Sequence, residues 1–132
     1  MFEVTVGARF VATHQLRCRS GVAEKRHAHT WRVKVTVAGP QLDKLGLLAD
    51  FGLVRGHLAA VLGPLKRRHL NRLAPFRERN PSAENVAVYV AERLAEALPD
   101  GVHVGCVEVE EERGCVARFL PPRGRQHGPA AR

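Results

Sequence analysis

Three histidines near the N-terminus are the residues of this sequence whose type and spacing best suit chemistry. His27 and His29 form an H-x-H pair, and His14 precedes them. If the segment that starts at His27 is extended, side chains two positions apart leave the same face, so both rings could hold one metal ion. His14 would reach that ion from the end of a preceding strand. Three neutral imidazoles with an open fourth position are typical of a catalytic zinc site rather than a structural one.

Two N-terminal strands must position these histidines. Residues 2–10 alternate between apolar and other side chains, and residues 31–38 alternate cleanly. The predicted strands are therefore joined by a loop that carries the histidines.

Two helices and a hairpin are expected in the rest of the chain. The first helix covers residues 51–65 with Asp50 as its N-cap, and the second begins after the N-cap Ser82. Residues 102–111 and 115–120 alternate as the two strands of a hairpin. The predicted order of elements is ββααββ, which is an α+β fold.

The composition is that of an ordinary globular protein. The chain has 132 residues, 45% of them hydrophobic and 26% charged, which predicts one domain over residues 1–120. The Pro-, Gly- and Arg-rich residues 121–132 are expected to form a disordered basic tail. The sequence contains neither a long apolar run nor a signal-peptide core, so we expect a cytoplasmic protein without a membrane partner. The three cysteines lack C-x-x-C spacing and are expected to be reduced thiols.

The net charge of +8 favours anionic partners. The basic run at residues 66–68 could bind phosphate groups, contribute to a nucleic-acid patch, or be a solvated loop. Nucleic-acid modules need exposed aromatic rings, and this chain has only one Trp, one Tyr and five Phe, mostly at core-like positions. We therefore expect a small-molecule partner and no nucleic acid.

Six short motifs follow one another in a specific order. They are FVATHQL (residues 10–16), HAHTW (27–31), GLLADF (46–51), LN (70–71), PSAEN (81–85) and VEE (109–111). This order resembles the 6-pyruvoyl-tetrahydropterin synthase and 6-carboxy-tetrahydropterin synthase family over about residues 2–120. The resemblance implies a tunnelling fold, in which ββααββ subunits carry an antiparallel sheet with two helices on one face and assemble into a β-barrel. It also implies a homohexamer of two stacked trimers, with active sites between subunits.

The resemblance also implies roles for individual residues. Family members hold Zn²⁺ with three histidines and anchor the pterin ring with a glutamate on a late strand, which matches Glu111. The carboxylate of Glu111 has the phase of the apolar residues of its predicted strand, where an unpartnered charge is costly. The family uses the loop at Ser82 near the pterin, although Ser82 is first of all an expected helix cap. The matching zinc ligands are His14, His27 and His29.

The sequence departs from the family at the catalytic base. Carboxy-synthase members carry a cysteine four residues before the histidine pair, where this chain has Ala23, and Cys18 lies too far upstream to match. Another branch of the family has a glutamate three residues before the pair, and Glu24 stands there. Glu24 is therefore our candidate general base.

A second departure concerns proton transfer. The family places an Asp-His pair before the Leu-Asn motif, and here both positions are basic, Lys66 and Arg67. His69 could supply a proton carrier from two positions further on. Lys66 and Arg67 could instead bind the phosphate groups of a substrate, since guanidinium groups hold phosphate oxygens in pairs.

The favoured function is that of a zinc-dependent lyase that cleaves carbon–oxygen or carbon–carbon bonds of a dihydropterin side chain. A glutamate base favours retro-aldol cleavage of dihydroneopterin triphosphate to 6-hydroxymethyl-dihydropterin, because the resemblance associates a thiol base with the pyruvoyl and carboxy products. One alternative keeps the fold and the metal but applies ring-forming or aldehyde chemistry to a non-pterin, phosphorylated compound. A second alternative is a metal-bound ligand-binding protein without catalysis.

Overall fold

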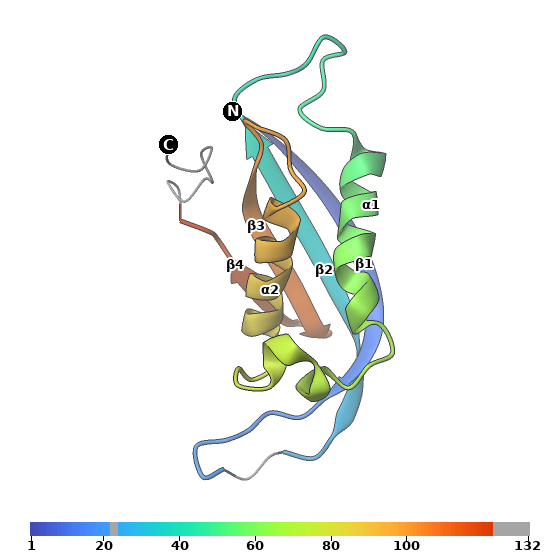
Figure 1. Cartoon of the computed structure of the whole chain (residues 1–132), viewed down its shortest axis with the longest axis vertical. Coiled ribbons are helices and arrows are strands. Elements are labelled where there is room, and N and C mark those ends of the chain that lie inside the picture. The colour runs from blue at the N-terminus through green and yellow to red at the C-terminus, as the bar shows by residue number, and fades with distance from the viewer. Residues whose placement is uncertain (22–23, 123–132) are drawn as a thin grey trace.

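The structure of the chain is a computed structural model that describes residues 1–21 and 24–122. Its strands and helices follow the order ββααββ, with short 3₁₀ helices between the two α-helices (Figure 1). The elements are β1 (Phe2–His14), β2 (His27–Gly39), α1 (Phe51–Leu62), η1 (Gly63–Leu65), η2 (Leu70–Arg72), η3 (Ala74–Phe76), α2 (Ala83–Ala95), β3 (His103–Glu112) and β4 (Cys115–Phe119).

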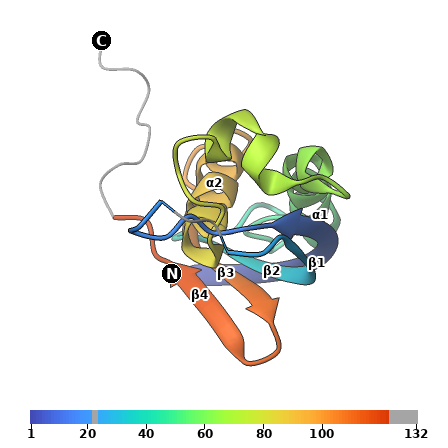
Figure 2. The same ribbon diagram turned by 90° about the horizontal axis from the view of Figure 1, so that it is seen from below.

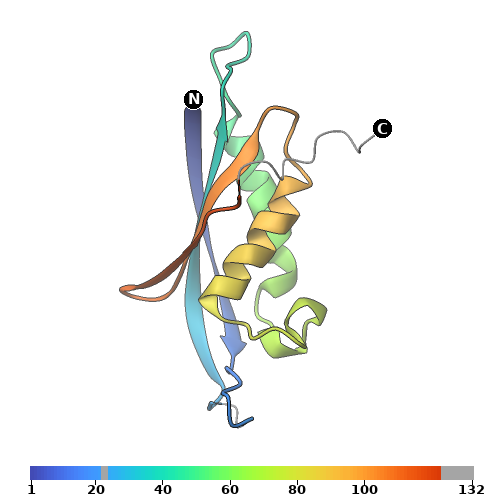
Figure 3. The ribbon, with the colours of Figure 1, turned by 90° about the vertical axis from the view of Figure 1, so that its left-hand side faces the viewer.

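One antiparallel sheet and two helices form two layers. Within the described ranges, the strands are ordered β1-β2-β3-β4, and each strand is antiparallel to its neighbour. Both α1 and α2 lie on the same face of this sheet, as the views in Figures 2 and 3 show. The predicted α+β fold with two helices on one face is confirmed.

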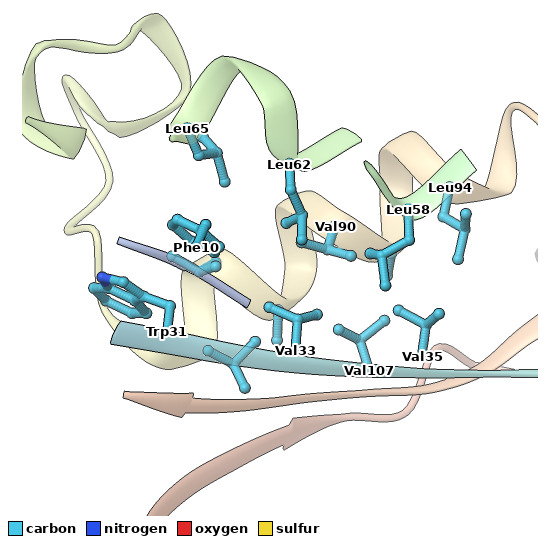
Figure 4. Close-up of a cluster of buried hydrophobic side chains, with 14 of the residues drawn as sticks. Phe10, Trp31, Val33, Val35, Leu58, Leu62, Leu65, Val90, Leu94 and Val107 are labelled. Atoms are coloured by element: carbon cyan, nitrogen blue, oxygen red, sulfur yellow. The ribbon is translucent and has the colours of Figure 1, made fainter. Parts of the chain in front are cut away.

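The core lies between these layers because the strands alternate. The odd-numbered residues of β2 from Trp31 to Val37 are almost completely buried beneath the helices. They meet Leu58 and Leu62 of α1 and Val90 of α2 in a single apolar cluster (Figure 4). This packing fixes which face of each strand points toward the helices.

The opposite face of the sheet is polar and carries cross-strand pairs. Arg32 lies 3.7 Å from Glu110, and Lys34 lies 4.0 Å from Glu108. Such half-exposed ion pairs stabilise a sheet only weakly. Their main consequence is that a one-residue slip in register would bury charges, so the register is well specified.

The first two strands are longer than their apolar alternation predicts. They pair continuously from Phe2 opposite Gly39 to His14 opposite His27. The prediction that the histidines lie in a loop is wrong, because the backbone ladder continues past the predicted strand ends as far as His14 and His27. The alternation of faces nevertheless persists to the end of each strand.

Both predicted N-caps are confirmed. The side chain of Asp50 accepts a hydrogen bond from the Leu53 amide at 3.0 Å, and Ser82 Oγ accepts one from the Asn85 amide at 3.1 Å. The first helix ends earlier than predicted, at Leu62, and continues as a 3₁₀ turn that contains Pro64. Proline has no amide proton to continue the α-helical ladder.

After this turn the chain runs along the free edge of β1. The Arg67 amide donates to the Val11 carbonyl at 2.7 Å, and the Thr13 amide donates to the Arg68 carbonyl at 3.0 Å. A parallel bridge pairs Thr13 with His69. This segment therefore covers part of an edge that would otherwise expose unpaired backbone groups.

Two of the sequence predictions fall on positions without a description. Ala23 and residues 123–132 lie outside the described residues, so the predicted tail is described only at its first two positions. In the part of the chain that the structure describes, no helix has the length and apolarity needed to cross a membrane.

We expect Leu58→Ala to lower the free energy of unfolding by about 2–5 kcal/mol, because it opens a cavity in the apolar cluster. Leu53→Ala, on the same helix but 57% exposed, is the matched control and should cost less than about 1 kcal/mol. Urea unfolding at one fixed protein concentration measures both. Equal losses of unfolding free energy in the two variants would contradict the placement of Leu58 in the core and Leu53 at the surface.

Candidate metal centre

The ends of β1 and β2 bring the three histidines together on the helix-covered face of the sheet. One ligand atom of each ring lies within 4.8 Å of those of the other two. His14 is fully buried, whereas His27 and His29 are half-buried. The strand pairing places His14 opposite His27, and His29 follows two positions later on the same face.

Backbone carbonyls orient two of the rings. His14 Nδ1 lies 2.8 Å from the Pro81 carbonyl oxygen, and His27 Nδ1 lies 2.8 Å from that of Lys25. A carbonyl oxygen can only accept, so each Nδ1 must carry the proton and donate. In the neutral rings Nε2 is therefore left without a proton and free to bind a metal, which is the arrangement that second-shell partners impose in metalloproteins.

The two oriented nitrogens face each other. His14 Nε2 lies 3.0 Å from His27 Nε2, and both are acceptors in the neutral rings. Burial is the main cause that lowers the pKa of His14, which favours the neutral form that metals bind. Two facing lone pairs repel each other unless a cation lies between them.

The third ring supplies independent support for an ion. Among the described residues, His29 Nε2 is a buried side-chain nitrogen without a hydrogen-bond partner. Leaving such an atom unpaired costs about 1–3 kcal/mol. Three nitrogens that converge in this way fit the donor set of a three-histidine zinc site.

Two hydrogen bonds between Leu16 and Glu24 bring the Glu24 carboxylate close to the histidine cluster. The Leu16 amide donates to Glu24 Oε1 at 3.0 Å, and the Glu24 amide donates to the Leu16 carbonyl at 2.8 Å. Glu24 Oε1 then lies 3.7 Å from His27 Nε2, with its side chain 42% exposed. The carboxylate predicted as a base is thus adjacent to the histidine cluster and accessible from solvent.

Glu111 approaches the cluster from β3. Its Oε1 lies 3.1 Å from His14 Nε2, and its side chain is 22% exposed. The β3–β4 register shifts between Glu110 and Glu112, so Glu111 is the extra residue of a bulge. Glu111 also lines a groove of about 410 Å³ between the start of α2 and β4.

The sequence matches one protein family over most of its length. A model described as 6-pyruvoyl tetrahydropterin synthase matches residues 3–122. The chain belongs to this family. It is 31% identical over 86% of its length to 6-carboxy-5,6,7,8-tetrahydropterin synthase of Synechocystis, of which it covers 89%. It is 32% identical over 72% of its length to dihydroneopterin monophosphate aldolase of Pyrococcus furiosus, of which it covers 76%.

Solved structures of the family have the same fold. Caenorhabditis elegans 6-pyruvoyl tetrahydropterin synthase matches with a TM-score of 0.79 at 20% identity, over 92% of this chain and 96% of that one. A Plasmodium vivax 6-pyruvoyltetrahydropterin synthase matches with a TM-score of 0.73 at 16% identity, over 89% and 96%. That second protein carries an alanine in place of a glutamate described as its catalytic residue. The resemblance to the tetrahydropterin synthase family and its tunnelling fold is confirmed.

Ser82, Lys66 and Arg67 are not part of the histidine cluster. Ser82 caps α2 directly after Pro81, whose carbonyl orients His14. The side chains of Lys66 and Arg67 are exposed, and Arg67 has a φ of 57°, in the left-handed region that is uncommon for residues other than glycine. This conformation occurs where the chain turns to follow β1.

His69 lies against a different face. Its Nδ1 is 3.1 Å from the hydroxyl of Thr13, the strand neighbour of His14 whose side chain leaves the opposite face of β1. Burial is the main cause that lowers the pKa of His69, and the positive charges of Arg26 and Arg72 lower it further. The structure thus brings Glu24 and Glu111 to the histidine cluster within one chain, but not His69.

Two asparagines with structural roles were missed by sequence reasoning. Asn71 accepts from the Gln15 amide at 3.0 Å and donates to the Gln15 carbonyl at 2.7 Å. Asn80 forms the same pair of bonds with Arg17, both at 2.8 Å. Each carboxamide thus mimics a strand partner and holds the segment between His14 and Glu24. The Leu-Asn motif and the Asn-Pro step were the available signals.

Replacing His29 should weaken metal binding. We expect His29→Ala to bind zinc at least tenfold more weakly than the unaltered protein, because one of three donors is lost. His57→Ala, which changes a histidine on α1, should keep its zinc. Zinc content per chain, measured by elemental analysis after dialysis, distinguishes the two variants, and equal contents would contradict the site.

Proposed function

We propose that this protein is a zinc-dependent lyase that acts on the side chain of a dihydropterin. The reaction that we propose is retro-aldol cleavage of dihydroneopterin triphosphate, which releases 6-hydroxymethyl-dihydropterin. The observation that carries this proposal is the Glu24 carboxylate, 3.7 Å from His27 Nε2 in the three-histidine cluster.

The relatives support a pterin substrate and, in part, an aldolase. One similar protein is named a 6-carboxy-tetrahydropterin synthase and another a dihydroneopterin monophosphate aldolase. The Plasmodium vivax neighbour is described as a variant in which a catalytic glutamate is replaced by alanine. Because Ala23 replaces the family's cysteine here, a glutamate base and aldolase chemistry fit this chain better than thiol chemistry.

The proposed reaction begins with proton removal by Glu24. The carboxylate takes the proton of the hydroxyl on the second side-chain carbon, and that carbon becomes an aldehyde as its bond to the first carbon breaks. The electron pair of this bond passes to the first carbon and is delocalised into the C=N bond of the ring. A proton returned to the first carbon then completes the hydroxymethyl group.

The bound zinc would supply Lewis acidity toward the side-chain oxygens, which assists both deprotonation and bond cleavage. His14, His27 and His29 would hold it. The carbonyls of Pro81 and Lys25 keep two of these rings oriented, so their contribution is positioning.

The other proposed roles concern binding and proton return. Glu111, at the edge of the groove beside α2, would anchor the pterin ring, with the Ser82 loop next to it. Lys66 and Arg67 would bind the substrate phosphates through their exposed cationic side chains. His69 is proposed as the proton carrier, and its route to the site must pass around the edge of β1.

We also propose that the protein is a cytoplasmic homohexamer of two stacked trimers, as the family resemblance implies. A polar sheet face on one side and helices on the other suit assembly of the sheets into a barrel. Light scattering coupled to size-exclusion chromatography should give a mass six times that of one chain.

A non-pterin, phosphorylated substrate is the second candidate, because Lys66 and Arg67 occupy the positions of the family's Asp-His pair. A zinc-loaded protein that binds phosphorylated compounds but neither binds nor converts dihydroneopterin phosphates would favour it. Zinc binding without turnover of either class of compound would favour a ligand-binding protein.

The proposed chemistry predicts a specific product and a specific loss of activity when Glu24 is replaced. Mass spectrometry after incubation of the zinc-loaded protein with 7,8-dihydroneopterin triphosphate should detect 6-hydroxymethyl-dihydropterin, and the monophosphate should be tested in parallel. Glu24→Gln should lower kcat at least about a hundredfold, the typical contribution of a general base, while zinc content stays unchanged.

Glu96→Gln, an exposed position at the end of α2, is the control and should keep full activity. A pyruvoyl or carboxy product from the unaltered protein would contradict the retro-aldol reaction. Full activity of Glu24→Gln would remove this residue from the mechanism.

His69→Gln tests proton return separately. If His69 carries the proton, this variant should lower kcat at least about tenfold without changing zinc content or substrate binding, because glutamine has no titratable group. His103→Gln, on β3, is the matched control. An unchanged kcat of the His69 variant would assign proton return to solvent or another residue.

A further inference from the structure

The contact between Glu111 and His14 joins two groups that cannot form a hydrogen bond with each other. The proton of neutral His14 is on Nδ1 and is donated to Pro81, so Nε2 presents a lone pair. The ionised Glu111 carboxylate is also only an acceptor, yet its Oε1 lies 3.1 Å from this nitrogen. Among the described residues, the ion-pair contact of the Glu111 carboxylate is with His14.

The spacing of these atoms is that of ligands around one ion. Zinc–nitrogen and zinc–oxygen bonds are about 2.0–2.2 Å long, so two neighbouring ligand atoms of a tetrahedral zinc are about 3.4 Å apart. The separation between His14 Nε2 and His27 Nε2 is 3.0 Å, and that between His14 Nε2 and Glu111 Oε1 is 3.1 Å. Glu111 therefore stands next to His14 at close to the distance expected of a further ligand.

We propose that Glu111 is the fourth ligand of the metal in the substrate-free protein and leaves the metal when a pterin ring enters the adjacent groove. This inference rests on the proposed function for its second half, the exchange, but not for its first half, the ligand. It gives one carboxylate two alternative partners. The open position needed for chemistry would then exist only when a ring is bound.

The local backbone lets Glu111 reach both partners. A β-bulge at Glu111 interrupts the pairing of β3 with β4, and bulges can re-aim a side chain relative to the regular strand. The carboxylate is partly exposed and borders the groove of about 410 Å³ between α2 and β4. The Glu111 carboxylate therefore stands between the histidine cluster and the groove.

The other nearby carboxylate is held differently. Glu24 Oε1 accepts a hydrogen bond from the Leu16 amide at 3.0 Å and lies 3.7 Å from His27 Nε2, beyond the spacing of neighbouring ligands. The Leu16 amide therefore holds the Glu24 carboxylate beside the histidine cluster, in a position that suits a base. The two glutamates therefore have different roles. Glu111→Gln should lower zinc affinity, whereas Glu24→Gln should lower kcat and leave the zinc content unchanged.

Metal affinity in the absence of substrate tests the first half of the inference. Competition with a chromophoric chelator should show that Glu111→Gln binds zinc about tenfold or more weakly than the unaltered protein. Glu110→Gln is the matched control, because Glu110 lies on the other face of β3 and faces Arg32. Equal affinities of the two variants and the unaltered protein would overturn the fourth-ligand assignment.

Cobalt-substituted protein tests the exchange. The visible absorption of Co²⁺ depends on its ligands, so addition of 7,8-dihydroneopterin should change the spectrum of the unaltered protein and of Glu110→Gln. The spectrum of Glu111→Gln without a pterin should already differ from that of the unaltered protein. A spectrum that is unchanged by dihydroneopterin at saturating concentration would overturn the exchange.

A crystal structure of the unaltered, zinc-loaded protein without a pterin decides the matter if a variant does not fold. A Glu111 carboxylate oxygen within about 2.2 Å of the zinc supports the inference, and one beyond about 3 Å overturns it. Failure of the proposed function can be distinguished from failure of this inference. If the protein converts no dihydropterin but Glu111→Gln still binds zinc more weakly, the lyase proposal is wrong and the assignment of Glu111 as a ligand stands.

Discussion

Continuous pairing of β1 with β2, up to the residues that carry imidazoles, is the constraint on which the metal centre depends. The pair His14 and His27 closes the ladder, so the backbone hydrogen bonds of the sheet set the separation of the two rings. The register itself is determined elsewhere, by the burial of Trp31 and the valines of β2 under the helices. A slip of one residue would expose that apolar face and turn the rings away from each other. The packing of the core therefore determines the geometry of the histidine cluster.

The loop before α2 connects helix formation to the metal centre. Ser82 caps the helix, and the preceding carbonyl of Pro81 accepts the proton of His14. Asn80, one residue earlier, binds the backbone of Arg17 with both groups of its carboxamide. Three consecutive residues thus attach the start of α2, the imidazole of His14 and the segment that leads to Glu24. Such shared anchoring makes the ligand geometry depend on the packing of α2.

Two glutamates reach the same cluster by different means, and this difference bears on function. Glu24 is held by backbone hydrogen bonds in a loop, which suits a base that must stay at one place. Glu111 projects from a bulge at the border of a groove, which suits a group with two partners. Side chains of one chemical type can thus have separate roles because their backbones constrain them differently.

The sequence by itself determined the order of the elements, the two helix caps and the identity of the three histidines. These follow from local rules, since alternation, capping residues and the H-x-H spacing act over a few positions. Glu24 and Glu111 were also accessible from sequence, but only through their positions in family motifs. The extent of β1 and β2 was not, because backbone pairing continues where hydrophobic alternation stops.

Only the tertiary structure decided which groups surround and orient the three histidines. The bonds of Asn71 and Asn80 to residues 15–17 and the carbonyl of Pro81 on His14 join segments more than fifty residues apart. The position of His69 behind β1 was equally hidden, since it depends on the path of the chain along a sheet edge. Contacts of this kind arise from packing and long-range hydrogen bonds, which no local pattern of residues encodes.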